Sequence, residues 1–130
     1  MLLPTTLCLA ASAALINLWL GGRISKVRHA AKISVGDGGH EQLVCRMRSQ
    51  ANFIENVPLT LILVAAIELA GKGGIWLALV GALFMISRVA HPLGMERPSP
   101  NALRAGGTMV AMLVQLGLAV VAVLIALRLF

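Results

Sequence analysis

Charged residues are scarce in this chain of 130 residues, since Asp, Glu, Lys and Arg together make up only 12% of it. Soluble domains carry about 25% charged residues because water must solvate their surface. Hydrophobic residues account for 58% of the chain, and the mean hydropathy is +0.89. This composition excludes an ordinary water-soluble domain and indicates that much of the surface faces lipid.

Acidic and aromatic residues are also few. Five Asp and Glu residues stand against 11 Lys and Arg residues, which gives a formal net charge of +6. In a soluble protein such an excess would suggest a nucleic-acid partner. However, aromatic residues make up 4% of the chain and tyrosine is absent, so a surface on which bases could stack is hard to build. We therefore expect no nucleic-acid partner.

Cysteine is limited to Cys8 and Cys45, which could form at most one disulfide and show no Cys-x-x-Cys spacing. We expect both thiols to be reduced. His91 has no second His or Cys at ligand spacing, so we expect no metal site.

Long apolar runs dominate what remains. A helix that crosses the bilayer core needs about 20 apolar residues, and its backbone groups must be paired within the helix. Four runs meet this need and are joined by a long polar loop, a tight turn and a medium loop. The sequence therefore predicts one all-α domain over residues 1–130, an integral membrane up-and-down four-helix bundle. The runs cover about 1–20, 51–70, 75–90 and 105–127, and the connections cover 21–48, 71–74 and 91–104.

The basic residues are distributed unequally between the two sides of this bundle. Nine Lys and Arg residues fall on the side of the long and medium loops, and only Lys72 and Arg128 fall on the other. Because basic loops stay in the cytoplasm, we expect both large loops inside and both termini outside. The first run could instead be a cleaved signal peptide, but no basic residue precedes it and a basic cluster follows it, which favours a retained helix.

Three polar residues of the second run lie on one helical face. Counted at about 100° per residue, Arg48, Asn52 and Glu55 fall within about 60° of one another, whereas Gln50 points to the opposite side. A carboxylate in a membrane span faces a partner or a cavity. The stripe could be an internal salt bridge of Glu55 with Arg48 or with an arginine of another helix. It could also bind a small, zwitterionic, net acidic molecule such as glutathione, although the residues alone do not single out that ligand.

Glu68, at the far end of the same run, has a simpler interpretation. It precedes Lys72 by four residues, and we expect these two side chains to form a surface ion pair.

The sequence resembles the MAPEG family, the membrane-associated proteins in eicosanoid and glutathione metabolism, and in particular its bacterial members. The stretch from Arg48 to Pro58 is similar to the Arg-x-x-x-Asn-x-x-Glu signature of that family. Val35-Gly-Asp-Gly-Gly39 and Arg88-Val-Ala-His91 are similar to further stretches of relatives. The resemblance implies a homotrimer that binds glutathione at each subunit interface, and for a bacterial member it implies the inner membrane.

The resemblance also implies roles for individual residues. Arg48, Asn52 and Glu55 would hold glutathione with help from Gln50. Three further residues outside this helix would join the site: Arg28 as a contact for a carboxylate, His91 as a binding residue, and Arg104 as the catalytic group that activates the thiol. A guanidinium favours the ionised thiolate, which is a small fraction of a thiol with a pKa of about 8.5 at neutral pH.

The chain departs from the family where tyrosines are expected, because Met95 and His91 occupy those positions. Catalysis could act through Arg104, could use His91, or could be lost. The expected function is glutathione-dependent conjugation of lipophilic electrophiles or reduction of lipid hydroperoxides. The alternative is a non-catalytic membrane protein that binds lipid or glutathione. A small multidrug-type exporter would need a carboxylate in the first run, which has none.

Overall fold

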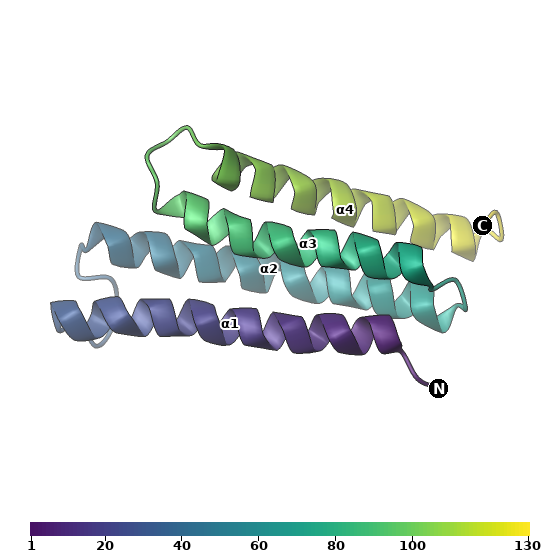
Figure 1. Ribbon diagram of the computed structural model, residues 1–130, viewed down its shortest axis with the longest axis horizontal. Helices are drawn as coiled ribbons and strands as arrows, with labels where there is room; N and C mark the ends of the chain where they lie inside the picture. Colours follow the sequence, from purple (N-terminus) through teal and green to yellow (C-terminus); the bar gives the residue numbers. More distant parts are fainter.

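Four long helices run alternately up and down and place both termini at the same end of the molecule (Figure 1). The computed structural model describes residues 1–130. The helices are α1 (Pro4–Ala31), α2 (Glu41–Leu69), α3 (Ile75–Met95) and α4 (Ala102–Ala126). All four are long and apolar enough to span a membrane, so the predicted all-α, multi-pass membrane bundle is confirmed.

The first two helices extend well beyond their apolar runs. The expected loop over 21–48 was wrong, because α1 continues to Ala31 and α2 already begins at Glu41. The reason is that Ile24 and Val27 lie on one face of α1 and pack with Leu43 of α2 in a small second core. This packing stabilises helices whose outer faces are polar. The true connection covers residues 32–40.

The connection between α3 and α4 is also shorter than expected. Helix α3 passes through Pro92 and ends at Met95, so the expectation that residues 91–95 belong to a loop was wrong. Helix α4 then begins after Asn101, whose side-chain Oδ1 accepts a hydrogen bond from the backbone N–H of Arg104 at 2.9 Å. Such an N-cap satisfies a backbone donor that the helix leaves unpaired.

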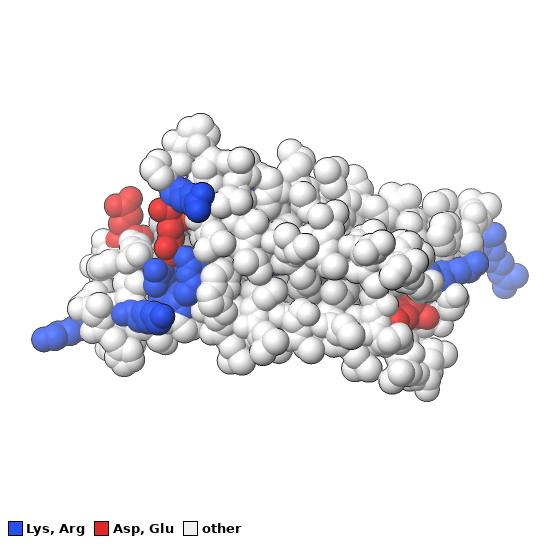
Figure 2. Space-filling model, viewed as in Figure 1, with Lys and Arg blue, Asp and Glu red and all other residues white.

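Helices α2 and α3 pack against each other through the middle of the bundle, whereas α1 and α4 do not touch. The main core draws on all four helices, with Leu9, Phe53, Phe84 and Ala111 among its buried members. Large apolar side chains also cover the outside of every helix, as expected for surfaces that meet lipid. The space-filling view accordingly shows charged residues at the two ends and a broad uncharged belt between them (Figure 2). Which end faces the cytoplasm stays a prediction.

Glu68 makes a different contact from the expected one. Its carboxylate accepts hydrogen bonds from the backbone N–H groups of Thr5 and Thr6, both at 2.9 Å, and from the Thr6 hydroxyl at 2.8 Å. No ion pair joins it to Lys72, so that prediction was wrong. The physical reason is that α1 begins without a capping side chain of its own, and a carboxylate is favoured at a helix N-terminus.

At the opposite end, one carboxylate ties three elements together. Glu96, directly after α3, forms ion pairs with Arg23 of α1 at 2.7 Å and with Arg46 of α2 at 2.5 Å. Arg46 also donates to the backbone carbonyl of Arg23. These contacts hold the polar extensions of α1 and α2 against the end of α3.

Candidate functional site

A buried arginine lies at the centre of the candidate site. Arg88 of α3 is only 2% exposed, and its guanidinium donates hydrogen bonds to Asn52 Oδ1 of α2 and to the carbonyl of Gly107 in α4, both at 2.6 Å. A third bond goes to the Ser87 hydroxyl at 3.3 Å. No carboxylate of the chain pairs with this cation. Arg88 therefore joins three helices and fixes the orientation of Asn52.

The two charged residues of the polar stripe on α2, Arg48 and Glu55, have no ion-pair partner in the protomer. Asn52 is half-buried and turned toward Arg88, whereas Arg48 and Glu55 are exposed on the surface of the protomer. Both ion pairs in the chain involve Glu96, so Glu55 forms none with Arg48 or with an arginine of another helix. The alternative of an internal salt bridge is therefore wrong for the protomer. A cation and an anion remain about two turns apart, on either side of an amide that is already fixed.

His91 and Arg104 lie beside this group. His91 is 6% exposed within α3, and its backbone and Cβ lie against Gly107 of α4. Arg104 is on the first turn of α4 with its side chain exposed. A Cβ added to Gly94 would overlap the backbone of Arg104, so Gly94 allows the close approach that sets the position of this turn.

Two of the expected binding residues have structural contacts elsewhere in the protomer. Gln50 donates from Nε2 to Asn17 Oδ1 of α1 at 3.2 Å, on the side of α2 away from the stripe. Arg28 donates to the carbonyl of Gly36 at 2.8 Å and to the sulfur of Met47 at 3.6 Å, so it holds the α1–α2 connection in place. The structure therefore brings together Asn52, Arg88, His91 and Arg104, and leaves Gln50 and Arg28 apart from them. Their roles in binding glutathione stay predictions.

Of the two residues at the expected tyrosine positions, Met95 lies on a different surface from His91. Met95 lines a hollow of about 430 Å³ that also includes Cys45 and Glu96. Cys45 and Cys8 are both free thiols. No three His, Cys, Asp or Glu side chains of the chain lie close enough together to hold a metal ion.

Sequence reasoning assigned no binding role to two polar residues that organise this region. Arg88 is the only charged residue in the third apolar run, and that isolation was the available signal. Gln115 lies in the uncharged fourth run, and its Nε2 donates to the Asn56 carbonyl at 2.9 Å and to the Thr60 hydroxyl at 3.1 Å. Hydrogen bonds of this kind hold neighbouring helices together in membranes.

Comparison with known proteins supports the family resemblance of the sequence. The model of the MAPEG family matches residues 6–124, which is nearly the whole chain and includes all the residues of the candidate site. A comparison with curated proteins gives no match. The match spans the four helices that the structure arranges as an up-and-down bundle. The chain therefore belongs to the MAPEG family of membrane proteins.

Proposed function

We propose that the protein is a glutathione-dependent membrane enzyme that conjugates lipophilic electrophiles or reduces lipid hydroperoxides. The observation that carries the proposal is the open stripe on α2, where Arg48 and Glu55 are exposed and unpaired on either side of Asn52. Membership of the family implies a membrane protein of eicosanoid and glutathione metabolism. Glutathione has two carboxylates, one ammonium group and two peptide groups, which complement a guanidinium, a carboxylate and an amide.

The contacts of Asn52 indicate which of its atoms would meet the ligand. Its Oδ1 is occupied by Arg88, and this leaves the Nδ2 group free to donate to a carbonyl or carboxylate oxygen. Arg48 would bind a carboxylate and Glu55 the ammonium group. Each charge-assisted hydrogen bond of this type contributes about 1.5 to 3 kcal/mol.

The chemical step would use Arg104. Its guanidinium would stabilise the glutathione thiolate, and the thiol proton would pass to solvent. In conjugation, the thiolate sulfur forms a bond to an electrophilic carbon, and the displaced electron pair leaves with a leaving group or is protonated on the product. In reduction, the sulfur attacks the outer peroxide oxygen and an alcohol leaves; a second glutathione then yields the disulfide and water.

A homotrimer would explain why charged side chains lie on the outer face of α2. Contact of Glu55 with hydrocarbon would cost about 2.5 to 3.5 kcal/mol. Contact with a neighbouring subunit is therefore more favourable than contact with lipid. Mass measurement of the protein in lipid nanodiscs tests this part, and a monomer that binds glutathione with full affinity would contradict it.

Calorimetry on the purified protein tests glutathione binding. Arg48→Ala and Glu55→Gln should each weaken the affinity by about 10- to 100-fold, because each removes one charged contact. Arg97→Ala is the matched control, since Arg97 is an exposed arginine in the α3–α4 connection without a hydrogen-bond partner for its side chain. Equal affinity in all three variants would contradict the proposal.

The absence of tyrosine favours a second candidate, a family member that binds glutathione without catalysis. Stopped-flow absorbance of the thiolate separates the two functions. An enzyme should produce a thiolate signal on mixing with glutathione, and Arg104→Ala should remove most of it. Binding without any thiolate signal would favour the non-catalytic protein.

A further inference from the structure

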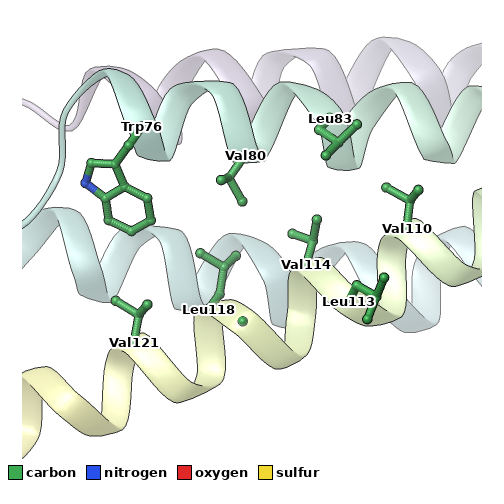
Figure 3. Close-up of a pocket in the computed structure, with 9 residues that line it drawn as sticks. Trp76, Val80, Leu83, Val110, Leu113, Val114, Leu118 and Val121 are labelled. Carbon is green, nitrogen blue, oxygen red and sulfur yellow. The ribbon is translucent and has the colours of Figure 1, made fainter.

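Two hollows on the surface of the protomer differ in the kind of molecule that they could hold. In Figure 3, Trp76, Val80 and Leu83 of α3 face aliphatic side chains of α4 across an open space, so that groove is apolar. A polar hollow of about 460 Å³ lies instead where α1 ends, at the end of the bundle away from the termini. It suits a polar ligand, because only one of its six lining residues is hydrophobic. The polar hollow is lined by Ser25, Arg28, His29, Lys32, Ile33 and Ser34.

The polar hollow carries positive charge that the chain does not neutralise. Arg28 and Lys32 stand in its wall, and no Asp or Glu does. Both ion pairs of the chain involve Glu96, so neither of these two cations has a carboxylate partner. Asp37, in the connection that follows, accepts a hydrogen bond from the backbone N–H of Gly39 at 2.9 Å instead. The charge of the hollow therefore favours an anion.

Arg28 and Lys32 differ in how they are held. Basic residues are common in the last turn of a helix because they favour its negative end. Arg28 has this structural role, since it donates to the carbonyls of Ile33 at 3.5 Å and Gly36 at 2.8 Å, whereas Lys32 donates to no carbonyl. The backbone of Lys32 is left-handed, with φ of 56°, and returns the chain so that Ser34 also lines the hollow. The ammonium group of Lys32 is therefore left for a ligand.

The hydroxyl group of Ser25 is also left without a partner in the protein. Serines within helices commonly donate to a carbonyl of the preceding turn. Ser12, Ser49 and Ser87 do so, at 2.6 to 2.8 Å. Ser25 lies within α1 but forms no such bond, and its hydroxyl lines the polar hollow together with that of Ser34. The hollow therefore offers neutral donors from both α1 and the connection beside its cations.

We propose that the polar hollow binds a phosphate group, carried either by a lipid headgroup or by a soluble phosphate compound. The oxygens of a phosphate are strong acceptors that point in several directions. Donors stand on two sides of the hollow, with the His29 ring and the Lys32 ammonium group on α1 and the Ser34 hydroxyl on the connection. A planar carboxylate would leave part of these donors unused. The volume also leaves room for the group that carries the phosphate. This inference does not depend on glutathione binding.

The position of the polar hollow along α1 makes both sources accessible. Trp19 lies 4.8 Å from the guanidinium of Arg23, and tryptophan is enriched at the headgroup level of membranes. From Trp19 to Ser25, α1 rises by about 9 Å. Each headgroup layer is about 5 to 8 Å thick, since it separates a core of about 30 Å from a total of about 40 to 45 Å. We therefore expect the hollow to begin at the outer edge of the headgroups.

Two binding measurements on the purified full chain test the inference. In a maltoside detergent without phospholipid, calorimetry with inorganic phosphate should show one saturable site per protomer if the ligand is soluble. Native mass spectrometry with added phosphatidylglycerol should show one retained lipid per protomer if the ligand is a headgroup. Binding in the first measurement alone assigns the hollow to a soluble phosphate compound, and binding in the second alone assigns it to a lipid. Both results support a phosphate site.

Variants of two lysines on α1 separate a site from diffuse attraction. Lys32→Gln should weaken binding of the probe by about five- to tenfold, because it removes one charge-assisted contact at a partly hydrated site. Lys32→Arg keeps the cation and should keep most of the affinity. Lys26→Gln is the matched control, because Lys26 is an exposed lysine of the same helix that does not line the hollow. Equal losses in Lys26→Gln and Lys32→Gln would overturn the inference, since net charge alone would then explain the binding.

The chemical class of the ligand has its own control. Acetate at the same concentration should compete weakly with phosphate, and equal competition would mean that the hollow accepts any anion. Failure of both inorganic phosphate and phosphatidylglycerol to bind the parent protein would also overturn the proposal.

A parallel titration separates this inference from the proposed function. Glutathione affinity should be the same in Lys32→Gln as in the parent, because no residue of α2 lines the polar hollow. A joint loss of phosphate and glutathione affinity would make the hollow part of the glutathione site and would overturn a separate phosphate site. If the parent protein binds no glutathione, the proposed function fails, and the phosphate measurements still decide the hollow.

Discussion

Asn52 and Arg88, 36 residues apart in the sequence, are joined by a hydrogen bond of 2.6 Å between Oδ1 and the guanidinium. This bond connects α2 to α3 and gives a buried cation one of its few partners. An unpaired charge inside a protein costs several kcal/mol, so both residues are constrained by each other. The amide that we propose to meet glutathione is therefore held in place before any ligand arrives.

The first prediction concerns this pair. Asn52→Ala should lower the free energy of unfolding by about 1 to 3 kcal/mol, because it removes an acceptor from a buried guanidinium. Asn52→Asp should retain most of the stability, since a carboxylate can accept the same bond. Chemical denaturation in mixed micelles measures both. If Asn52→Ala and Asn52→Asp lose equal stability, the role of the acceptor would be refuted.

The second prediction concerns the cap that Glu68 forms on α1. Glu68→Ala should cost about 1 to 2 kcal/mol, because three donors at the start of that helix lose their acceptor. Lys72→Ala should cost less than about 1 kcal/mol, since its ammonium group forms no ion pair with Glu68. Thermal unfolding compares the stability of the two variants. A larger loss of stability for Lys72→Ala would favour an ion pair between Glu68 and Lys72 over the cap.

The third prediction concerns pH. Burial raises the pKa of Glu96, but the hydrogen bond from Arg46 and the charges of Arg23 and Arg46 outweigh it and hold the pKa below its ordinary value of 4.5. A lowered pKa in the folded state means that the stabilisation is complete above about pH 4.5 and is lost as the pH falls through the folded value.

Glu96→Gln should therefore remove about 0.5 to 1 kcal/mol at neutral pH and flatten the loss of stability in acid. Glu41→Gln is the control, because the Glu41 side chain forms no ion pair. Unfolding measured from pH 7 down to about pH 3 checks the prediction. An acid limb of the same size in Glu96→Gln and in the parent would mean that other groups cause it.

The fourth prediction compares two glycines near Arg104. Gly94→Ala should destabilise the protein by about 1 to 3 kcal/mol and lower kcat, because the new methyl group overlaps the backbone of Arg104 and displaces it. Gly106→Ala should be neutral or slightly stabilising, because its Cβ enters open space and alanine favours a helix. Unfolding and turnover measured on both variants should separate them clearly. Equal effects would mean that the α3–α4 contact at Gly94 is adjustable.

Hydropathy alone predicted the four helices, because a membrane leaves the backbone no other arrangement over such long apolar runs. It could not predict where the helices end. Ile24 and Val27 extend α1 into a polar segment through contacts with α2, which depend on how two distant segments meet. Pro92 was a misleading sign of a helix end, since α3 continues through it to Met95.

The candidate site, too, could be predicted from the sequence only in part. Helical periodicity predicted that Arg48, Asn52 and Glu55 share a face, and both charged members are indeed exposed. Periodicity within one helix could not show that Asn52 turns toward Arg88, or that Glu68 reaches the start of α1 rather than Lys72. These partners lie 36 and 63 residues away, and only the packing of the bundle brings them together.

The polar extensions of α1 and α2 have a consequence for how a water-soluble peptide would reach the proposed binding site. Each continues for about 15 Å past its apolar run, and Arg46 and Arg23 fasten both to Glu96. Because the apolar runs span the membrane, we expect these joined extensions to project into the aqueous phase. Arg48 lies on the α2 extension, just before the apolar run begins. A hydrophilic thiol peptide would thus bind while still partly hydrated. Only its sulfur atom would need to enter the hydrocarbon core of the bilayer, where the lipophilic substrate dissolves.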